Sequence, residues 1–515
     1  MSPRAHRRRR RRHGRSSPPS LPYSTQRMGL LVGDVIRHGA RVTPQRLAAT
    51  NGDEELTFAE LDARSSQVAR ALSQLGVRRH DRVAWWGETS LEAMPIFGAC
   101  AKLGAPFMPV NARVGVDEAA EVIGYAKPKV TIVDESHAAA TPSFPYADQA
   151  AVFRDAAGAE TSDVVDRDLD ERDTHVIFFT SGSTGRSKGV VLSNRVSYLR
   201  SFPNLLTDHS DGTVCMFPLF HMSGWSMTLN AWQMRCPLHL VPNPDAHSLL
   251  ATAQRRKATR LYCIPAVWRR VLEHDRSSYD LSTLKECDTG TSATPPELLA
   301  AIKDAFPETV TRIYYGSTEA GPVAMLADAD VMRKPGAVGL PPPGVAIRLT
   351  DEGEVCTSSE LLMDGYFEQP DATADALRPI EAGGLCWYHS GDLGSLDDEG
   401  YLSIVGRVHD VLRTGGETVA PGEVESVLAD HPAIAEVAVV GLPDAEWGEI
   451  VCAAVVPRPG HGADVSVRSL RAHCDGRLAA FKQPRRVELV DELPRTAATG
   501  QVQRTLLVER ITAGA

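Results

Sequence analysis

Hydrophobic and polar positions in the first part of the chain keep the spacing of alternating helices and strands. A capping box at residues 57–60 and apolar side chains at helical spacing from Leu61 to Leu75 predict a helix that Gly76 ends. Further elements are expected as strands at residues 82–86, 107–110 and 130–134 and as a helix at residues 91–103. This alternation predicts the α/β class, with parallel-rich sheets and flanking helices. The Ala-, Asp- and Pro-rich residues 138–172 are expected to be irregular.

A second, smaller unit is expected to begin near Arg407. Pro421 suits the first turn of a helix that would reach about residue 430. The elements expected after it are strands at residues 435–441, 450–456 and 486–490 and a helix at residues 467–480. The chain is therefore predicted to form a large N-terminal body, residues 28–406, and a small, mobile α+β C-terminal lid domain, residues 407–515.

The first 27 residues differ from the rest in charge. They hold nine arginines, including the run at residues 7–12, and no acidic residue. We interpret them as a disordered Arg-rich tail before Met28, although a transit peptide has the same composition. The remaining chain has 46 basic against 65 acidic side chains, and this balance disfavours nucleic acid as a partner.

Composition excludes several classes of protein. Of the 515 residues, 43% are apolar and 23% are charged, which is typical of a globular enzyme and excludes wholesale disorder. No stretch reaches the ~18–20 apolar residues of a membrane helix, so no membrane span is expected. Nine cysteines without a Cys-x-x-Cys pair disfavour a disulfide framework and a structural zinc site, which predicts a reduced, cytoplasmic setting.

The strongest local signal is an apolar strand, residues 175–179, that leads into a loop of small and hydroxylated residues, 180–188. Glycine lets a backbone approach an anion closely, and hydroxyls, free N–H groups and Lys188 can then bind it. The loop is not a Walker A loop, because that motif needs glycine directly before its lysine and Ser187 stands there. A flexible turn with an exposed lysine is the alternative for such a loop on its own.

Three further motifs follow in order. Residues 312–321 enter a second Gly-containing loop that presents a carboxylate, residues 388–393 include an aspartate, and residues 400–407 end in an arginine. With the 180–188 loop, they resemble the adenylate-forming (AMP-binding) superfamily, most of all its acyl-CoA synthetases, the fatty-acid and aryl-acid CoA ligases. The resemblance covers about residues 30–507 and implies ATP, Mg²⁺ and CoA as cofactors.

The resemblance also implies a role for each motif residue, whereas a carboxylate taken singly would be read as a surface or turn residue. Thr180 and Glu319 would bind the Mg²⁺ that bridges the β- and γ-phosphates, because magnesium prefers hard oxygen ligands. Asp392 would accept both ribose hydroxyls, and Arg407 would brace the nucleotide. The residues implied at the nucleotide are Thr180, Ser181, Gly182, Ser183, Thr184, Gly185, Lys188, Tyr315, Gly316, Ser317, Thr318, Glu319, Asp392 and Arg407. Those implied at the pantetheine of CoA are Gly415, Gly416 and Glu417, and those implied in catalysis are Lys188, Thr318, Glu319, His221 and Gln501.

The acid substrate is expected near His221. In similar synthetases this histidine borders the carboxylate pocket, and residues 290–293 look like another wall of it. An amino-acid-activating relative would place an aspartate here, so the pair Phe220-His221 disfavours amino acids and favours a fatty or aryl acid. A hydrogen-bonded core histidine is the alternative interpretation of His221.

Two positions depart from the family pattern. At the junction of the two units the family usually has Asp or Lys as a hinge residue, and this chain has His409. Relatives carry a lysine directly after Gly500 that bridges the substrate carboxylate and the α-phosphate, and this chain has Gln501. A glutamine amide donates hydrogen bonds without a full charge, and loss of one aimed donor costs on the order of 10²–10³ in rate.

Three functions remain open from the sequence. The first is ATP-dependent activation of a carboxylic acid as acyl-adenylate and transfer to CoA, with AMP and pyrophosphate released. The second is an adenylate-forming ligase of specialised metabolism whose acceptor is an amine or another small nucleophile. The third is a nucleotide-binding relative with little turnover because of Gln501. The intact nucleotide motifs favour the first, an acid–thiol ligase, and the oligomeric state stays open.

Overall fold

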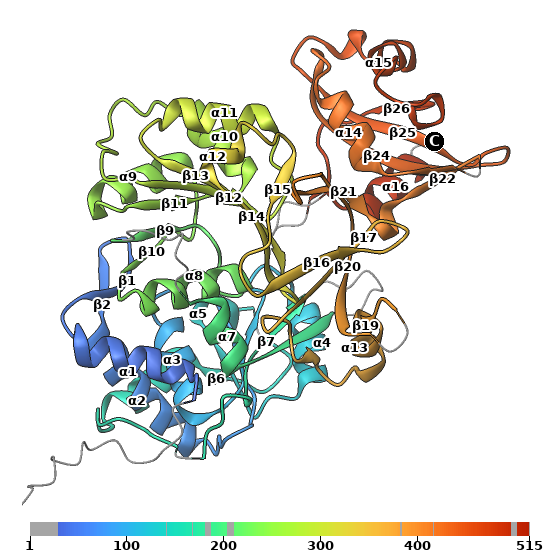
Figure 1. Cartoon of the computed structure of the whole chain (residues 1–515). Coiled ribbons are helices and arrows are strands. Elements are labelled where there is room, and N and C mark those ends of the chain that lie inside the picture. Colours follow the sequence, from blue (N-terminus) through green and yellow to red (C-terminus); the bar gives the residue numbers. More distant parts are fainter. Residues whose placement is uncertain are drawn as a thin grey trace, which may run out of the picture.

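The computed structural model describes residues 29–513, apart from residues 141, 167, 181–186, 203–210, 382–383, 416 and 496–501. The predicted tail, residues 1–27, lies outside the described residues. Within them the strands form four sheets, of which the two largest are mainly parallel (Figure 1). The predicted α/β class with parallel-rich sheets and flanking helices is confirmed.

The seven-stranded sheet has the order β18-β8-β7-β4-β3-β5-β6. Its strands are β3 Val83–Trp86, β4 Phe107–Val110, β5 Val130–Val133, β6 Ala147–Asp148, β7 Thr174–Thr180, β8 Lys188–Ser193 and β18 Gly365–Tyr366. Strands β3 to β7 pair in parallel, whereas β8 is antiparallel to β7 and to β18. The three strands predicted first, β3, β4 and β5, are confirmed, and their continuous apolar runs are typical of strands covered on both faces.

The eight-stranded sheet has the order β14-β13-β12-β11-β9-β10-β1-β2. Its strands are β1 Leu47–Asn51, β2 Glu54–Thr57, β9 Thr213–Cys215, β10 Leu238–Leu240, β11 Arg260–Tyr262, β12 Glu286–Gly290, β13 Val310–Ser317 and β14 Gly321–Leu326. All neighbouring pairs are parallel except the two at the edges, β1–β2 and β13–β14. The carboxyl ends of β9, β11, β12 and β13 therefore meet at one edge, where open α/β sheets bind ligands.

Helices cover these two sheets. Those of the body are α1 Val32–Val42, α2 Phe58–Gln74, α3 Ala93–Leu103, α4 Val116–Ala126, α5 Glu135–Ala138, α6 Gln149–Ala157, α7 Asn194–Arg200, α8 Met222–Gln233, α9 Ala246–Arg256, α10 Pro265–Glu273, α11 Pro296–Ala305, α12 Asp328–Val331 and α13 Pro370–Ala376. Helix α2 begins with the predicted capping box, in which Thr57 accepts from the backbone N–H of Glu60 and Glu60 accepts from that of Thr57. Helices α10 and α11 lie on the outer side of the eight-stranded sheet (Figure 1).

A six-stranded antiparallel sheet follows in the chain. Its strands are β15 Ala337–Gly339, β16 Val345–Leu349, β17 Glu354–Ser359, β19 Leu377–Pro379, β20 Cys386–Leu396 and β21 Leu402–Arg407. Strands β20 and β21 pair so that Asp392 lies directly opposite Arg407. This register brings two of the predicted nucleotide residues together.

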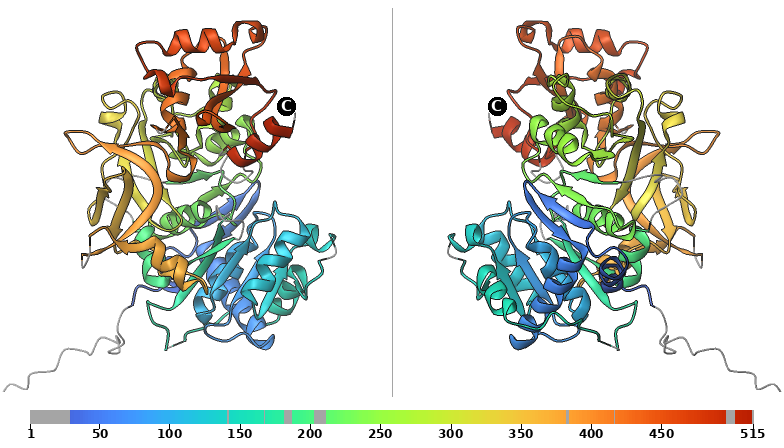
Figure 2. Two further views of the ribbon diagram at one scale, coloured as in Figure 1. Left: turned by 90° about the vertical axis from the view of Figure 1, so that its right-hand side faces the viewer. Right: turned by 90° about the vertical axis from the view of Figure 1, so that its left-hand side faces the viewer.

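The C-terminal residues form a five-stranded sheet of β22 Leu412–Thr414, β23 Glu417–Val419, β24 Ile434–Asp444, β25 Gly448–Pro457 and β26 Arg486–Leu489. Their helices are η1 Val408–Asp410, α14 Pro421–Ala429, η2 Gly462–Asp464, α15 Val467–Cys474, η3 Ala480–Lys482 and α16 Arg504–Ala513. Helices α14 and α15 pack on one face of the sheet and α16 on the other. Figure 2 shows this unit at the end of the molecule away from the seven-stranded sheet. The boundary at residue 407 stays a prediction.

Two sequence predictions need correction. Residues 138–172 are not irregular throughout, because they contain β6 and the helix α6. Asp148 caps α6 by accepting from the backbone N–H of Ala151, and Val152 and Ala156 become buried against the body. Helix α15 ends at Cys474 rather than near residue 480, because Gly476 takes a positive φ of 75° that breaks the helical run.

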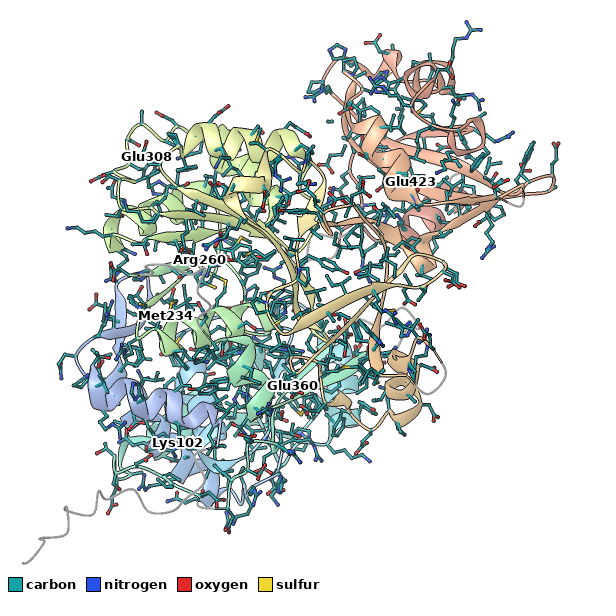
Figure 3. All side chains as sticks on the ribbon, viewed as in Figure 1. Lys102, Met234, Arg260, Glu308, Glu360 and Glu423 are labelled. Atoms are coloured by element: carbon teal, nitrogen blue, oxygen red, sulfur yellow. The ribbon has the colours of Figure 1, made fainter. Side chains whose placement is uncertain are left out.

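Lys102, which Figure 3 labels in the N-terminal body, has a fully buried side chain. Its ammonium group donates to Asp62 at 2.7 Å, to Asp163 at 2.6 Å and to the hydroxyl of Ser66 at 2.9 Å. Three acceptors match its three N–H donors, so α2, α3 and the segment that contains Asp163 are held together by one charge.

Lys102→Ala is expected to lower the free energy of unfolding by about 2–3 kcal/mol, because Asp62 loses its cation and Asp163 keeps only Arg37. The cost falls below that of a fully buried pair, since both carboxylates keep some exposure to solvent. Urea unfolding followed by tryptophan fluorescence measures the change. Lys303→Ala, which breaks a more exposed pair with Asp328, is the control and is expected to cost about 1 kcal/mol or less. Equal losses in the two variants would contradict this account.

No helix among the described residues is long and apolar enough to cross a membrane. All nine cysteines are free thiols, and eight of them are buried.

Candidate functional site

The predicted phosphate loop connects β7 to β8. These strands form an antiparallel hairpin in which Thr180 lies opposite Lys188, and the hydroxyl of Thr180 donates to the carbonyl of Lys188 at 3.4 Å. Val176, Ile177 and Phe178 are buried, which anchors the hairpin in the seven-stranded sheet. Five predicted residues lie outside the described residues, namely Ser181, Gly182, Ser183, Thr184 and Gly185.

Tyr366 connects Lys188 to Glu319. The ammonium group of Lys188 lies 4.9 Å from the centre of the Tyr366 ring, and the Tyr366 hydroxyl donates to Glu319 Oε1 at 3.1 Å. Tyr366 reaches this position because β18 pairs with β8, where Tyr366 lies opposite Val190. Lys188 and Glu319 are 131 positions apart in the sequence, yet both lie next to Tyr366. The site therefore contains both a cation and a carboxylate.

Arg200 fixes the backbone that carries Glu319. Its guanidinium donates to the carbonyls of Thr318, Glu319 and Leu361, each at 2.7 Å. Burial lowers the pKa of Arg200 to about 10, and the Glu319 carboxylate opposes that shift. Arg200 stays charged at neutral pH, so this loop is held by charge-assisted hydrogen bonds.

The tight β13–β14 hairpin presents Tyr315, Gly316, Ser317 and Thr318 next to Glu319. A Cβ on Gly316 would lie 2.1 Å from the carbonyl oxygen of Gly321, so only glycine allows this close approach of the two strands. The hydroxyl of Ser317 accepts from the backbone N–H of Ala320 at 3.0 Å, which closes the turn.

Asp392 forms the second half of the site. Its Oδ2 accepts from the hydroxyl of Tyr315 at 2.6 Å, and its Oδ1 lies 3.0 Å from Nε of Arg407. Burial raises the pKa of Asp392, and Arg407 and Tyr315 oppose that shift. The buried carboxylate keeps free lone pairs beside an arginine whose side chain is half exposed, as a binding site for neighbouring hydroxyls requires.

The two halves meet at Tyr388. Burial raises the pKa of this tyrosine, and so do the carboxylates of Glu319 and Asp392, which lie near it. Tyr315, which binds Asp392, and Glu319 lie on the same β13–β14 hairpin, so the structure brings Lys188, Glu319, Tyr315, Asp392 and Arg407 together in one region.

His221 lies at the N-terminus of α8. Its Nδ1 accepts from the backbone N–H of Ser223 at 3.2 Å, so the proton of the neutral ring sits on Nε2 and can be donated elsewhere. Burial lowers the pKa of His221 to about 4, and Arg113 adds to that shift. The imidazole is therefore a neutral hydrogen-bond donor at physiological pH.

Ion pairs fix the chain on both sides of the junction between the N-terminal body and the second unit. Arg407 pairs with Asp392 in the body, and Asp410 pairs at 3.0 Å with Arg504, which also holds Glu425 at 2.6 Å in the second unit. Only residues 408 and 409 separate these two anchors. A cavity of about 450 Å³ lies between residues 403–405 of the body and residues 422–426 and 477–482 of the second unit.

The remaining predicted residues lie in the second unit or outside the described residues. Gly415 precedes β23 with a φ of 60°, against the ring of Trp447, and Glu417 begins β23. Gly416 and Gln501 lie outside the described residues, as does the side chain of His409. Lys482, an ordinary family position in the sequence, forms an ion pair with Glu423.

Sequence reasoning missed Tyr366 and Arg200 and gave Tyr388 no role. Tyr366 lies in a two-residue strand, and Arg200 ends a helix, so neither position carries a local pattern. Tyr388 is the first residue of the recognised motif at residues 388–393, and that position was the one signal available from the sequence.

Two protein-family models match this chain. A model described as AMP-binding enzyme matches residues 36–367, and one described as AMP-binding enzyme C-terminal domain matches residues 423–499. Feruloyl-CoA synthase of an Amycolatopsis species is 31% identical over 488 residues, which cover 90% of this chain and 97% of the relative. Long-chain-fatty-acid–CoA ligase FadD13 of Mycobacterium tuberculosis is 31% identical over 513 residues, which cover 94% and 99%. Among solved structures, ATP-bound MatB from Rhodopseudomonas palustris is similar with a TM-score of 0.83 at 28% identity, covering 93% of this chain and 98% of that chain.

Proposed function

Because this chain belongs to the AMP-binding enzyme family and is an AMP-forming acid–CoA ligase like its relatives, we propose that it activates a fatty or aryl acid. The acid becomes an acyl-adenylate, and the acyl group then passes to CoA. The observation that carries this proposal is the arrangement of Lys188 and Glu319 around Tyr366 and of Asp392 beside Tyr315 on the neighbouring hairpin.

These residues suit a magnesium-bound nucleotide. Glu319 supplies a carboxylate and Thr180 a hydroxyl, which are the hard oxygen donors that Mg²⁺ prefers. They would hold the ion, which when bound offsets the charge of the phosphates. Lys188 and the N–H groups of its loop would bind the β- and γ-phosphates, while Tyr315 to Thr318 would line the adenine and the α-phosphate. Asp392 would accept the ribose hydroxyls beside Arg407.

The reaction then has two steps. A carboxylate oxygen of the acid attacks the α-phosphorus of ATP, the bond to the β-phosphate breaks, and pyrophosphate leaves. The thiol sulfur of CoA next attacks the acyl carbon, AMP leaves with the bonding electron pair, and the thiol proton is released. Two anions must approach each other in the first step, so positive charge near the α-phosphate accelerates it.

His221 is proposed to donate from Nε2 to the acid carboxylate. The relatives named for feruloyl and for long-chain fatty acids support both an aryl and a fatty substrate. The second unit is proposed to act as a mobile lid, residues 407–515, that turns about residue 409 and presents Gly415, Gly416 and Glu417 to the pantetheine of CoA.

A pH prediction follows from the pKa of His221. A pKa of about 4 keeps the ring neutral above that pH, so kcat/KM for the acid is expected to show no His221 ionisation between about pH 5 and 8. His221→Asn keeps a hydrogen-bond donor and is expected to give a profile of the same shape at a lower rate. An inflection near pH 6.5 in the parent that disappears in His221→Asn would contradict the assignment.

The proposed function is tested with purified protein, ATP, Mg²⁺ and a panel of carboxylic acids, with AMP and acyl-CoA both measured. Sustained AMP release is expected only when an acid and CoA are present, with one acyl-CoA formed for each AMP. Sustained AMP release that needs an acid but ignores CoA would overturn the CoA step in favour of another acceptor. Saturable ATP binding without formation of AMP or acyl-CoA would contradict the proposal that the protein is catalytically active.

A further inference from the structure

Aromatic side chains cover the carboxyl edge of the eight-stranded sheet. The ring centres of Phe217 and Tyr262 lie 5.1 Å apart, and those of Tyr262 and Tyr314 lie 5.8 Å apart. Phe217 follows β9, Tyr262 ends β11, and Tyr314 lies opposite Gly290 at the end of β12. The three rings therefore form a continuous row, here called the ring row, where ligands of open α/β sheets bind.

The ring row is close in sequence to the predicted carboxylate contact and to a residue of the nucleotide site. Phe217 precedes His221 by four residues, and Tyr314 is next to Tyr315, which holds Asp392. An acid bound between His221 and the α-phosphate is therefore expected to extend toward the end of the sheet that carries these rings.

A buried ionic layer lies beneath the ring row. Asp288 accepts from Arg260 at 2.6 Å and from Arg312 at 2.9 Å, and Glu286 pairs with Arg312. Both guanidinium groups lie within 6 Å of the Tyr314 ring centre, at 5.8 and 5.9 Å. Figure 3 shows Arg260 on the side of the sheet away from α10 and α11. A long alkyl tail cannot extend past the rings without separating these ion pairs, which is costly in a buried place.

The two tyrosine hydroxyls are available to a ligand. Tyr262 is 9% exposed, and its hydroxyl oxygen lies 2.7 Å from where a Cβ on Gly290 would stand, so glycine makes room for it. Among the described residues, neither the Tyr262 nor the Tyr314 hydroxyl forms a hydrogen bond. Both hydroxyls can therefore form a hydrogen bond with an oxygen of a bound ligand.

We propose that Tyr262 and Tyr314 form the floor of the acyl site and select a compact aromatic acid with a polar ring substituent over a long aliphatic acid. This assignment rests on the proposed function and narrows its substrate class. Ring stacking on the row is worth up to about ten-fold in binding, and each hydrogen bond to a phenol adds a similar factor.

The assignment is tested by kcat/KM, measured through AMP release with CoA, for 4-hydroxycinnamate, cinnamate and decanoate. The parent is expected to use 4-hydroxycinnamate at least about 100-fold better than decanoate. Tyr262→Phe and Tyr314→Phe are expected to lower kcat/KM for 4-hydroxycinnamate about ten-fold and leave that for cinnamate within two-fold. Tyr314→Gly removes a ring of the floor beside the ionic layer and is expected to lower kcat/KM for both aromatic acids about ten-fold and to leave that for decanoate within two-fold.

Two controls separate selectivity from misfolding. Tyr279→Phe removes a hydroxyl that contacts His247 and His274 away from the ring row, and all three acids are expected to keep their rates. ATP binding of Tyr314→Gly is expected to match that of the parent.

The outcomes distinguish this assignment from the proposed function. A parent that prefers decanoate, or variants that change all three acids by the same factor, would overturn the assignment alone. A parent that forms AMP with no acid of the wider panel would overturn the proposed function and this assignment with it.

Discussion

Gln501→Lys will accelerate acid-dependent pyrophosphate release on the order of 10²- to 10³-fold. The family's lysine places a full positive charge between the substrate carboxylate and the α-phosphate, where two anions approach each other. A glutamine amide supplies only a dipole. Single-turnover measurement of pyrophosphate with saturating ATP and acid isolates this step from the CoA step.

Gln503→Lys is the matched control, because it adds the same charge two residues away, where the backbone is fixed by a hydrogen bond from the N–H of Gln503 to the carbonyl of Pro494. This control is expected to change the rate less than about three-fold. Equal acceleration in both variants would mean that a general gain in charge is responsible. No acceleration in Gln501→Lys would mean that other groups already supply the charge.

Glu319→Gln is expected to lower kcat on the order of 10²- to 10³-fold and to raise the Mg²⁺ concentration required for half-maximal activity. The amide keeps the shape of the side chain and an oxygen for the Tyr366 hydroxyl. Arg200 and the N–H of Met363 bind the backbone carbonyl of residue 319, so these contacts survive. The change therefore removes the charge while it preserves the loop.

Tyr366→Phe is the control for Glu319→Gln. It removes the hydrogen bond that orients the carboxylate and keeps the ring that lies beside Lys188. Loss of one neutral–charged hydrogen bond is expected to cost about ten-fold in kcat. The assignment of Glu319 to magnesium would be contradicted if its Gln variant kept the parent's Mg²⁺ dependence.

Local patterns predicted the parts of the fold that depend on neighbouring residues. Thr57 and Glu60 form the expected capping box, and the apolar runs at Phe107–Val110 and Val130–Val133 are buried strands. Helix α6 was missed because its Ala-rich sequence has few large apolar residues, and its stability comes from burial of Val152 and Ala156 by distant elements.

In the candidate site, too, local sequence predicted the individual residues but not the long-range contacts between them. The motifs gave Lys188, Glu319 and Asp392 from short-range sequence, but the connection between the first two runs through Tyr366. That tyrosine reaches the site by pairing of β18 with β8, over more than 170 residues of chain. Such long-range pairing leaves no local signal, so the sequence alone could not supply it.

Acid-dependent exchange of labelled pyrophosphate into ATP tests the central claim most directly, because adenylate formation is reversible and needs no CoA. The account predicts exchange that requires Mg²⁺ and a carboxylic acid, persists without CoA and falls steeply in Glu319→Gln. Exchange with none of the acids in a broad panel, or release of ADP in place of pyrophosphate, would contradict it.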